Sequence, residues 1–367
     1  MQRVDEREHG FNRAARGDFG PRLAAEFQRQ VAKYPLSGAL GTMTGVMGRL
    51  VEGGGAQSAS RTGEKPAMPG VAGSVAPGTD DPGRMALHIK ETAYFLRADA
   101  VGICELPAYA VYSHSRRGGM PAHLDHKYAV AILVDQDWRT ASAFDGRDWI
   151  SNSMSFLGYA TAAFIAGILA DYIRRLGYPA RAHNALNYQV VVPPILLWAG
   201  LGELSRIGDT VINPFLGPRF KAAVVTTDLP LTVDKPIDFG LQDFCGKCRK
   251  CARACPSRAL SDGGKEMHNG YEKWPTDVQK CTSMRVGNPK GAGCGTCIKV
   301  CPWNKPFTPL HRAVNRVVRT VPAVRRLAIW GDDLLGYGKA HSDQQWWLDL
   351  EDKDGVLNVP GRGAQRK

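Results

Sequence analysis

The chain of 367 residues lacks several features that would assign it to a common class of proteins. It has no run of 18 apolar residues without charge, and its best candidate, residues 156–170, leads directly into Asp171 and Arg174. Since a membrane-spanning helix needs about 20 apolar residues, we expect no membrane span. A Walker A loop and a Gly-x-Gly-x-x-Gly stretch between a strand and a helix are also missing. Their absence argues against the common nucleotide-binding folds.

The first residues also lack the marks of an export signal. Residues 1–7 contain no apolar core and no twin-arginine pattern. We therefore expect a cytoplasmic location.

What the chain does have is a concentration of cysteine. Eight of its nine cysteines lie in two runs that each end in Cys-Pro, the first spaced Cys-x2-Cys-x2-Cys-x3-Cys. Two such runs are typical of a pair of [4Fe-4S] clusters, in which the fourth cysteine of one run binds the cluster of the other. The spacing predicts one ligand set of Cys245, Cys248, Cys251 and Cys301, and a second set of Cys255, Cys281, Cys294 and Cys297.

Two other uses of these cysteines fit the spacing less well. Disulfide frameworks are typical of short secreted chains, and this chain is long and has no export signal. Structural zinc sites usually come as separated Cys-x2-Cys pairs rather than as ladders of four cysteines that end in proline. The ninth cysteine, Cys104, follows apolar residues, and we expect it to be a small buried residue in a strand.

The formal net charge of +12 predicts an acidic partner, which could be a nucleic acid, a membrane surface or an electron carrier. Four basic residues lie between cysteines of the first run: Lys247, Arg249, Lys250 and Arg253. They could bind a ferredoxin or a flavodoxin that delivers electrons. The alternative is a solvated basic surface that compensates the negative charge of the clusters.

The patterns along the chain predict four regions and an α+β fold. Residues 1–82 form an N-terminal region, in which the Gly- and Pro-rich residues 52–83 are typical of a linker or a lid. Residues 83–240 alternate between helical patterns (85–97 and 151–177) and strand patterns (100–104, 128–134, 188–192 and 222–227). Residues 241–306 are the ferredoxin-like cysteine module, and residues 307–367 begin with a basic helix at 309–329 and end in a tail.

A ferredoxin with two clusters needs only about sixty residues. Here roughly 240 residues precede the cysteines, so we expect a further task beyond electron transfer. The chain also has no Asp-x-His-x-x-Gly stretch of the kind that supplies a histidine ligand to cobalt. From the residues alone, a redox enzyme and an electron-transfer module both remain open.

Over residues 83–350 the chain resembles the reductive dehalogenases, which are corrinoid iron–sulfur enzymes that remove halogen from organic halides. The stretches that carry this resemblance are Ala199–Glu203, Ile212–Arg219, Thr227–Leu231, Asp234–Pro236, Phe244–Cys245, the shortened second cysteine run, Cys301–Trp303, Gly336–Lys339 and Trp346–Trp347. The first 80 residues match no family that we can name.

The resemblance implies a base-off cobalamin in a nitroreductase-like domain, near one of two [4Fe-4S] clusters. The missing histidine motif agrees with a cobalt that has no histidine ligand. The implied reaction replaces halogen by hydrogen on an organohalide, with electrons from an external ferredoxin or flavodoxin, because extra flavin and ferredoxin domains are absent. A cytoplasmic location in this family implies a catabolic or detoxifying role.

The resemblance also implies catalytic residues. Tyr159, on the long helix, matches the proton donor, and Lys221 matches its basic neighbour, with Arg219 as the second choice. Arg285 could bind an anion, and Asn187 could lie near the proton donor. Without the resemblance, Tyr159 is a half-buried helix aromatic, Lys221 a surface lysine and Arg285 a partner for cluster charge. We expect His123 and His126 to be solvated loop residues rather than ligands of substrate.

Two other functions remain as alternatives. Epoxyqueuosine reductase, a related corrinoid enzyme that acts on tRNA, also carries Cys-Pro-Trp-Asn, and the positive charge would suit a nucleic acid. Residues 227–231 and 234–236, with a tyrosine and a basic residue in place of a catalytic aspartate, argue against it, so a nucleic-acid substrate is not expected. The other alternative is a non-catalytic electron-transfer subunit without a corrinoid.

Overall fold

The computed structural model describes residues 1–29, 35–51, 70–116, 122–185, 187–289, 293–341, 345, 347, 351–353 and 356–358. Of the predicted linker or lid, residues 52–69 lie outside the described residues, and residues 70–81 contain no helix or strand. Most of the predicted C-terminal tail lies outside them too.

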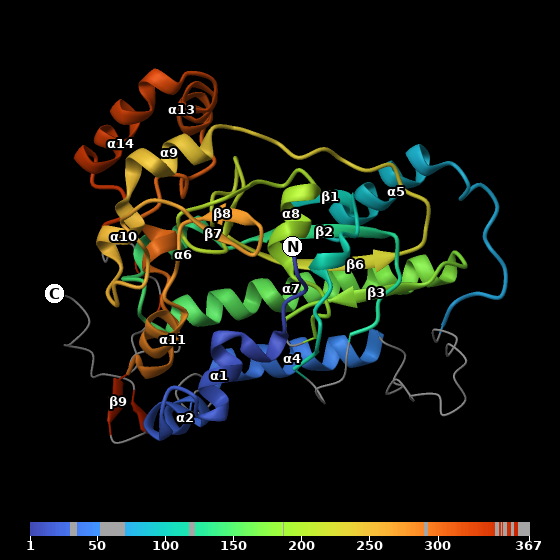
Figure 1. Ribbon diagram of the computed structural model, residues 1–367, viewed down its shortest axis with the longest axis horizontal. Coiled ribbons are helices and arrows are strands. Elements are labelled where there is room, and N and C mark those ends of the chain that lie inside the picture. The colour runs from blue at the N-terminus through green and yellow to red at the C-terminus, as the bar shows by residue number, and fades with distance from the viewer. Residues whose placement is uncertain are drawn as a thin grey trace.

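A four-stranded antiparallel sheet forms the centre of the fold (Figure 1). Its strands lie in the order β1 (Ala100–Glu105), β2 (Tyr128–Asp135), β6 (Phe220–Thr227) and β3 (Ala180–His183). The predicted strands at 100–104, 128–134 and 222–227 are confirmed, because each is a short apolar run that is buried on both faces. Cys104 is buried in β1, as expected, and burial raises the pKa of its thiol to about 12.

Helices cover both faces of this sheet. On one face, α5 (Pro82–Phe95) and α7 (Trp149–Arg175) bury Ile89 and Leu169 in one apolar cluster with Ile132. On the other face, α8 (Val192–Trp198) buries Ile195 in a second cluster with Leu133. Successive residues of β2 thus point to opposite faces of the sheet, and both faces are covered.

The helix α7 spans 27 residues and is the core helix of the fold. By length and composition it could cross a membrane, and among the described residues it is the one helix that meets this test. However, 56% of its most apolar window is buried within the protein. The helix lies between the sheet and α4 (Pro35–Val51), as Figure 1 shows. These contacts explain its apolar composition without a membrane.

Two predicted elements are wrong, and proline is the reason in both cases. At 188–192 only Val190 pairs, in an isolated bridge with Val111, because Pro193 and Pro194 fit the first turn of a helix and α8 begins there. The predicted helix at 309–329 is two helices, α13 (Pro309–Thr320) and α14 (Arg325–Leu334), separated by η3 (Pro322–Val324). Pro322 lacks the N–H that a continuous helix needs.

The cysteine-bearing segment folds into short elements beside the sheet (Figure 1). These are α9 (Leu241–Cys248), α10 (Lys250–Ala254), β7 (Glu266–His268), β8 (Tyr271–Lys273), α11 (Val278–Gly287) and α12 (Thr296–Lys299). The remaining elements are η1 (Glu6–Glu8), α1 (Gly10–Arg16), α2 (Pro21–Gln28), η2 (Ala108–Ala110), α6 (Trp138–Ala143), β4 (Glu203–Leu204), β5 (Val211–Ile212), β9 (Glu351–Lys353) and β10 (Val356–Asn358).

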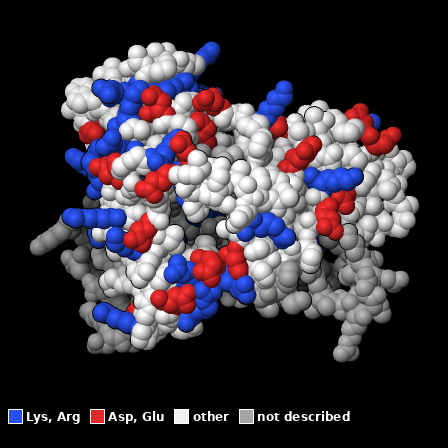
Figure 2. Space-filling view, viewed as in Figure 1, with Lys and Arg blue, Asp and Glu red and all other residues white. Residues whose placement is uncertain are grey.

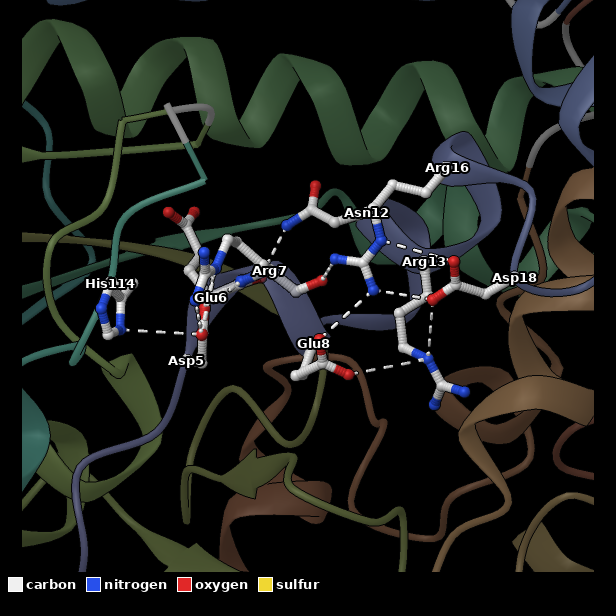
Figure 3. Close-up of polar contacts among 9 residues, drawn as sticks. All are labelled: Asp5, Glu6, Arg7, Glu8, Asn12, Arg13, Arg16, Asp18 and His114. Carbon is white, nitrogen blue, oxygen red and sulfur yellow. Dashed lines mark hydrogen bonds and ion pairs between the residues drawn. The ribbon is translucent and has the colours of Figure 1, made fainter. Parts of the chain in front are cut away.

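The N-terminal helices α1 and α2 pack against α11. Polar contacts around them are drawn in Figure 3, where Arg16 donates to Asp18 over 2.7 Å. A hydrogen bond from Arg7 lowers the pKa of Asp5 to about 2, and Asp5 also lies 3.7 Å from His114. These contacts fix the first residues of the chain to the loop that follows η2.

Two stretches that carry the family resemblance contact the cysteine segment directly. The buried carboxylate of Glu203 accepts the backbone N–H groups of Phe239 (3.2 Å) and Leu241 (3.1 Å) at the start of α9. Gly217 has a φ of 63°, and a Cβ at this position would lie 2.3 Å from the carbonyl oxygen of Trp303. Both contacts help to position the segment that carries the cysteines.

Candidate functional site

The side chains of the first predicted ligand set lie together in the interior. They are Cys245 and Cys248 on α9, Cys251 on α10, and Cys301 just after α12. All four are buried in one cluster. Burial raises the pKa of Cys245 to about 12 and that of Cys251 to about 11.

The side chains of the second set surround Cys297. Burial raises the pKa of Cys297, and the nearby thiols of Cys294, Cys281 and Cys255 raise it further. Cys251 of the first set is close enough to contribute as well, so the two sets adjoin.

This arrangement fits the chemistry of iron–sulfur ligation. A buried thiol that is surrounded by other thiols does not ionise readily, because charge is costly there and each thiolate repels the next. Metal cations remove that cost, since they bind the thiolate and displace its proton. Each set of four sulfurs is therefore suited to a cationic iron core.

The basic residues of the first cysteine run are less available than the sequence suggests. Lys247 pairs with Asp243 over 2.6 Å, and Lys250 is buried in contact with Asp332. Arg249 and Arg253 are exposed. In Figure 2, basic side chains are densest over the cysteine segment and α13, with acidic ones among them. Of the four charges in the possible docking patch, Lys247 and Lys250 are held in ion pairs, and Arg249 and Arg253 remain exposed.

Tyr159 and Lys221 are brought together by α7 and β6. The Lys221 Nζ lies 5.1 Å from the centroid of the Tyr159 ring. Both side chains are half-buried. Gly158 makes the approach possible, because a Cβ at this position would lie 2.9 Å from Cγ of Lys221.

A second tyrosine, Tyr188, lies beside this pair and was missed from the sequence. Its hydroxyl donates to the carbonyl of Ala222 over 2.8 Å. Burial raises the pKa of Tyr188 well above its ordinary value, and the nearby phenol of Tyr159 adds to the effect. Its position next to Asn187 was the only sequence signal for it.

Asn187 accepts a hydrogen bond from Arg181 over 3.1 Å through its side-chain oxygen. Arg181 also contacts Nδ1 of the buried His183, which accepts the N–H of Gln189 over 3.1 Å as well. His183 must therefore carry its proton on Nε2, which donates to Thr226 over 2.9 Å. Burial lowers the pKa of His183 well below its usual value. Asn187 thus belongs to a buried polar network next to Tyr188.

His126 belongs to the same network, so its assignment as a solvated loop residue is wrong. Its Nδ1 lies 2.8 Å from the Thr226 hydroxyl, and the side chain is half-buried. The Thr226 hydroxyl accepts the hydrogen bond from Nε2 of His183 and can donate its own hydrogen to Nδ1 of His126. His123 is exposed, as expected.

Arg219, the second choice for the basic partner of Tyr159, is held elsewhere. Its guanidinium is buried and makes two hydrogen bonds to the carboxylate of Asp135, each 2.9 Å long. A third, of 2.7 Å, goes to Asn304 of the cysteine segment. Arg219 therefore links the sheet to that segment, and Lys221 is the basic residue that faces Tyr159.

Arg285 lies on α11, beside the second cysteine set. Its guanidinium carbon is 4.5 Å from the centroid of the Phe11 ring. Burial raises the pKa of Cys281, and the charge of Arg285 partly offsets that rise. Among the described residues, its contacts are with α1 and the cysteines rather than with Tyr159 or Lys221.

Comparison with known proteins identifies the cysteine segment. Residues 244–304 match the family described as a 4Fe-4S double cluster binding domain. The predicted double-cluster module is thereby confirmed.

Relatives and solved structures cover far more of the chain. It is 30% identical to the tetrachloroethene reductive dehalogenase of Sulfurospirillum multivorans, over 78% of this chain and 62% of that protein. It is 36% identical to the enzyme of the same name from Desulfitobacterium hafniense, over 60% of this chain and 40% of that one. The structure of the catabolic reductive dehalogenase NpRdhA has a TM-score of 0.89 at 45% identity, over 98% of this chain and 50% of that one.

A further structure, described as suggesting a mechanism for B12-dependent dehalogenation, has a TM-score of 0.90 at 45% identity, with the same coverage. The epoxyqueuosine reductase of Escherichia coli is 27% identical over 42% of this chain and 45% of that protein. The chain spans about half the length of the two dehalogenase structures, and less than two thirds of the curated dehalogenases. The resemblance predicted from the sequence is confirmed: the chain is a relative of the reductive dehalogenases.

Proposed function

We propose that this chain is the catalytic part of a corrinoid-dependent reductive dehalogenase that replaces halogen by hydrogen on an organohalide. The observation that carries the proposal is the ammonium of Lys221, 5.1 Å from the ring centre of Tyr159. It occurs in a chain that is 45% identical, over nearly its whole length, to a structure associated with B12-dependent dehalogenation.

The overall reaction, R–X + 2e⁻ + H⁺ → R–H + X⁻, needs two electrons and one proton. The two cysteine sets hold [4Fe-4S] clusters, which carry the electrons one at a time. A bound cobalamin would supply the low-potential cobalt chemistry needed for breaking the carbon–halogen bond. What remains for the residues of this chain is to bind the substrate, exclude water and deliver the proton.

Tyr159 is the proton donor in this proposal. A phenol with a pKa near 10 is a weak acid. A cation within about 4–6 Å stabilises the phenolate that remains after proton transfer, and Lys221 is placed to be that cation. The ammonium can also attract the departing halide. Tyr188 lies beside this pair. Its hydroxyl hydrogen is donated to the carbonyl of Ala222, so Tyr188 is not the proton donor in this proposal.

Arg285 and Asn187 are secondary candidates in the proposal. Arg285 would bind an anion beside the second cluster. Asn187, held by Arg181, would orient polar groups near Tyr188.

The wider setting is also proposed. The corrinoid-binding domain comprises residues 83–240 with a nitroreductase-like fold and a base-off cobalamin, flanked by an N-terminal region (1–82), the ferredoxin-like module (241–306) and a C-terminal helical extension (307–367). A separate ferredoxin or flavodoxin would deliver the electrons, and the protein would work in the cytoplasm.

The test is metal and corrinoid analysis of protein made with ample cobalamin and purified without air, followed by halide-release assays. We expect iron, sulfide and cobalt in the protein and halide release from organohalides with a low-potential donor. Iron and sulfide without cobalt would refute the enzyme and leave an electron-transfer subunit. Reduction of an epoxide on tRNA without halide release would assign the chain to the epoxyqueuosine reductases instead.

A further inference from the structure

Arg206 is a buried cation next to the first cysteine set. Its side chain is only 2% exposed. It lies just after β4, in a loop fixed by Ser205, whose hydroxyl donates to the carbonyl of Thr210 over 2.7 Å and accepts the N–H of Ile207 over 3.1 Å. The position of Arg206 is therefore determined by the backbone that carries it.

The guanidinium contacts only neutral groups directly. Its Nε donates to the carbonyl of Cys245 over 3.0 Å, and one terminal nitrogen donates to the carbonyls of Ser261 and Gly263, both over 2.9 Å. Its carbon lies 4.6 Å from the ring centroid of Trp274. Within the described part of the chain, Arg206 forms no ion pair with a carboxylate. A buried charge without a counter-charge costs several kcal/mol, so a negative group is expected close by.

The cysteines of the first set are that negative group when a cluster is bound. Burial lowers the pKa of Arg206, while the sulfurs of Cys251 and Cys245 raise it, ahead of the exposed Asp262. A [4Fe-4S] cluster with four thiolates carries about two negative charges when oxidised and about three when reduced. A fixed positive charge therefore stabilises the reduced cluster more than the oxidised one.

We propose that Arg206 raises the reduction potential of the cluster held by Cys245, Cys248, Cys251 and Cys301. The residue acts through the cluster and does not touch substrate. This proposal rests on the clusters of the proposed function but not on its dehalogenase activity. The second set is outside the immediate contacts of Arg206, so its cluster should respond less.

The experiment is an EPR-monitored redox titration of the anaerobically purified full chain, in the wild type, Arg206→Gln and Arg206→Lys. Gln keeps hydrogen-bond donors for the carbonyls but removes the charge, whereas Lys keeps the charge and loses the planar donor set. We expect the Gln variant to shift one cluster to a more negative potential while the other cluster stays near its wild-type value. The Lys variant should keep both potentials close to wild type.

Each other outcome is decisive. No clusters in the wild type would refute the proposed function itself. If the clusters of the Gln variant keep their wild-type potentials, the proposed role of the charge is overturned. The same holds if the Gln and Lys variants shift the potential equally. Loss of the cluster from both variants would show that the hydrogen bonds matter rather than the charge, and would also overturn it.

Discussion

At the residue scale, the proposed chemistry depends on one phenol and one ammonium that come from different elements. Tyr159 is on α7 and Lys221 on β6, and nothing in their local sequence marks either as special. Only the fold places the Lys221 Nζ over the Tyr159 ring. The pair can therefore be tested one residue at a time.

Tyr159→Phe should remove most halide release and leave the visible absorption of both kinds of cofactor intact. A positioned general acid typically contributes about 10²–10⁴-fold to a rate, and this variant loses only the hydroxyl. The matched control is Tyr94→Phe, because Tyr94 is an exposed tyrosine on α5. Steady-state halide release decides the matter, and wild-type turnover in the Tyr159 variant would rule out this proton donor.

Lys221→Met should lower turnover, because the variant removes the cation that stabilises the phenolate left on Tyr159 after proton transfer. Lys221→Arg keeps the charge and should restore much of the turnover. Steady-state halide release measures both variants, and wild-type turnover in the Met variant would argue against the pairing.

The sequence identifies the types of residue at the site better than their partners. Arg219 and Lys221 are two residues apart, and either could have faced Tyr159 by spacing. Arg219 precedes β6 and is held by Asp135, a residue at the end of β2 that is far away in the sequence. His126 was misjudged for the same reason, because its partner Thr226 lies 100 residues later. Hydrogen bonds between distant segments leave no local pattern.

At the element scale, the crossing of α7 and β6 positions the site. Gly158→Ala should reduce turnover, because the added Cβ would lie 2.9 Å from Cγ of Lys221 and the lysine must move. Alanine gains up to about 1 kcal/mol in helix propensity, but overpacking costs about 1–3 kcal/mol. We expect roughly a tenfold loss of turnover and a net loss of stability of up to about 2 kcal/mol, measured by halide release and thermal unfolding.

The matched control for this variant is Gly331→Ala on α14, where no atom lies within 4 Å of the added Cβ. It should leave turnover unchanged. Equal turnover in the Gly158 variant and the wild type would mean that the position of Lys221 is not set by this contact.

The elements that sequence patterns found, and those they missed, differ in one physical respect. The strands β1, β2 and β6 each contain a continuous apolar run, and such runs are recognisable. The strand β3 contains Arg181 and His183, which are buried because they bond to Asn187 and Thr226. A strand that buries polar residues in a network has no apolar pattern, so it was not predicted.

At the scale of the whole molecule, two buried contacts hold the sheet and the cysteine segment in one arrangement. Arg219 reaches from Asp135 to Asn304, and Glu203 binds the start of α9. The cysteine spacing predicted the double-cluster module because its ligands are local and their number is fixed by the cofactor. It could not predict how the module is attached, since Glu203 and Arg219 lie in the preceding segment and their partners are partly backbone groups.

The crossed ligation between the two runs gives the last prediction. Cys255 follows Cys251 closely in the sequence, yet its thiol lies near Cys281 and Cys297 of the second set. Cys255→Ala should therefore abolish the same EPR signal as Cys294→Ala, whereas Cys251→Ala should abolish the other. The wild type with two clusters should contain about eight iron atoms per chain, and each variant should retain about half of them. If Cys255→Ala instead removed the signal that Cys251→Ala removes, each run would bind its own cluster, and the two sets would have to be reassigned.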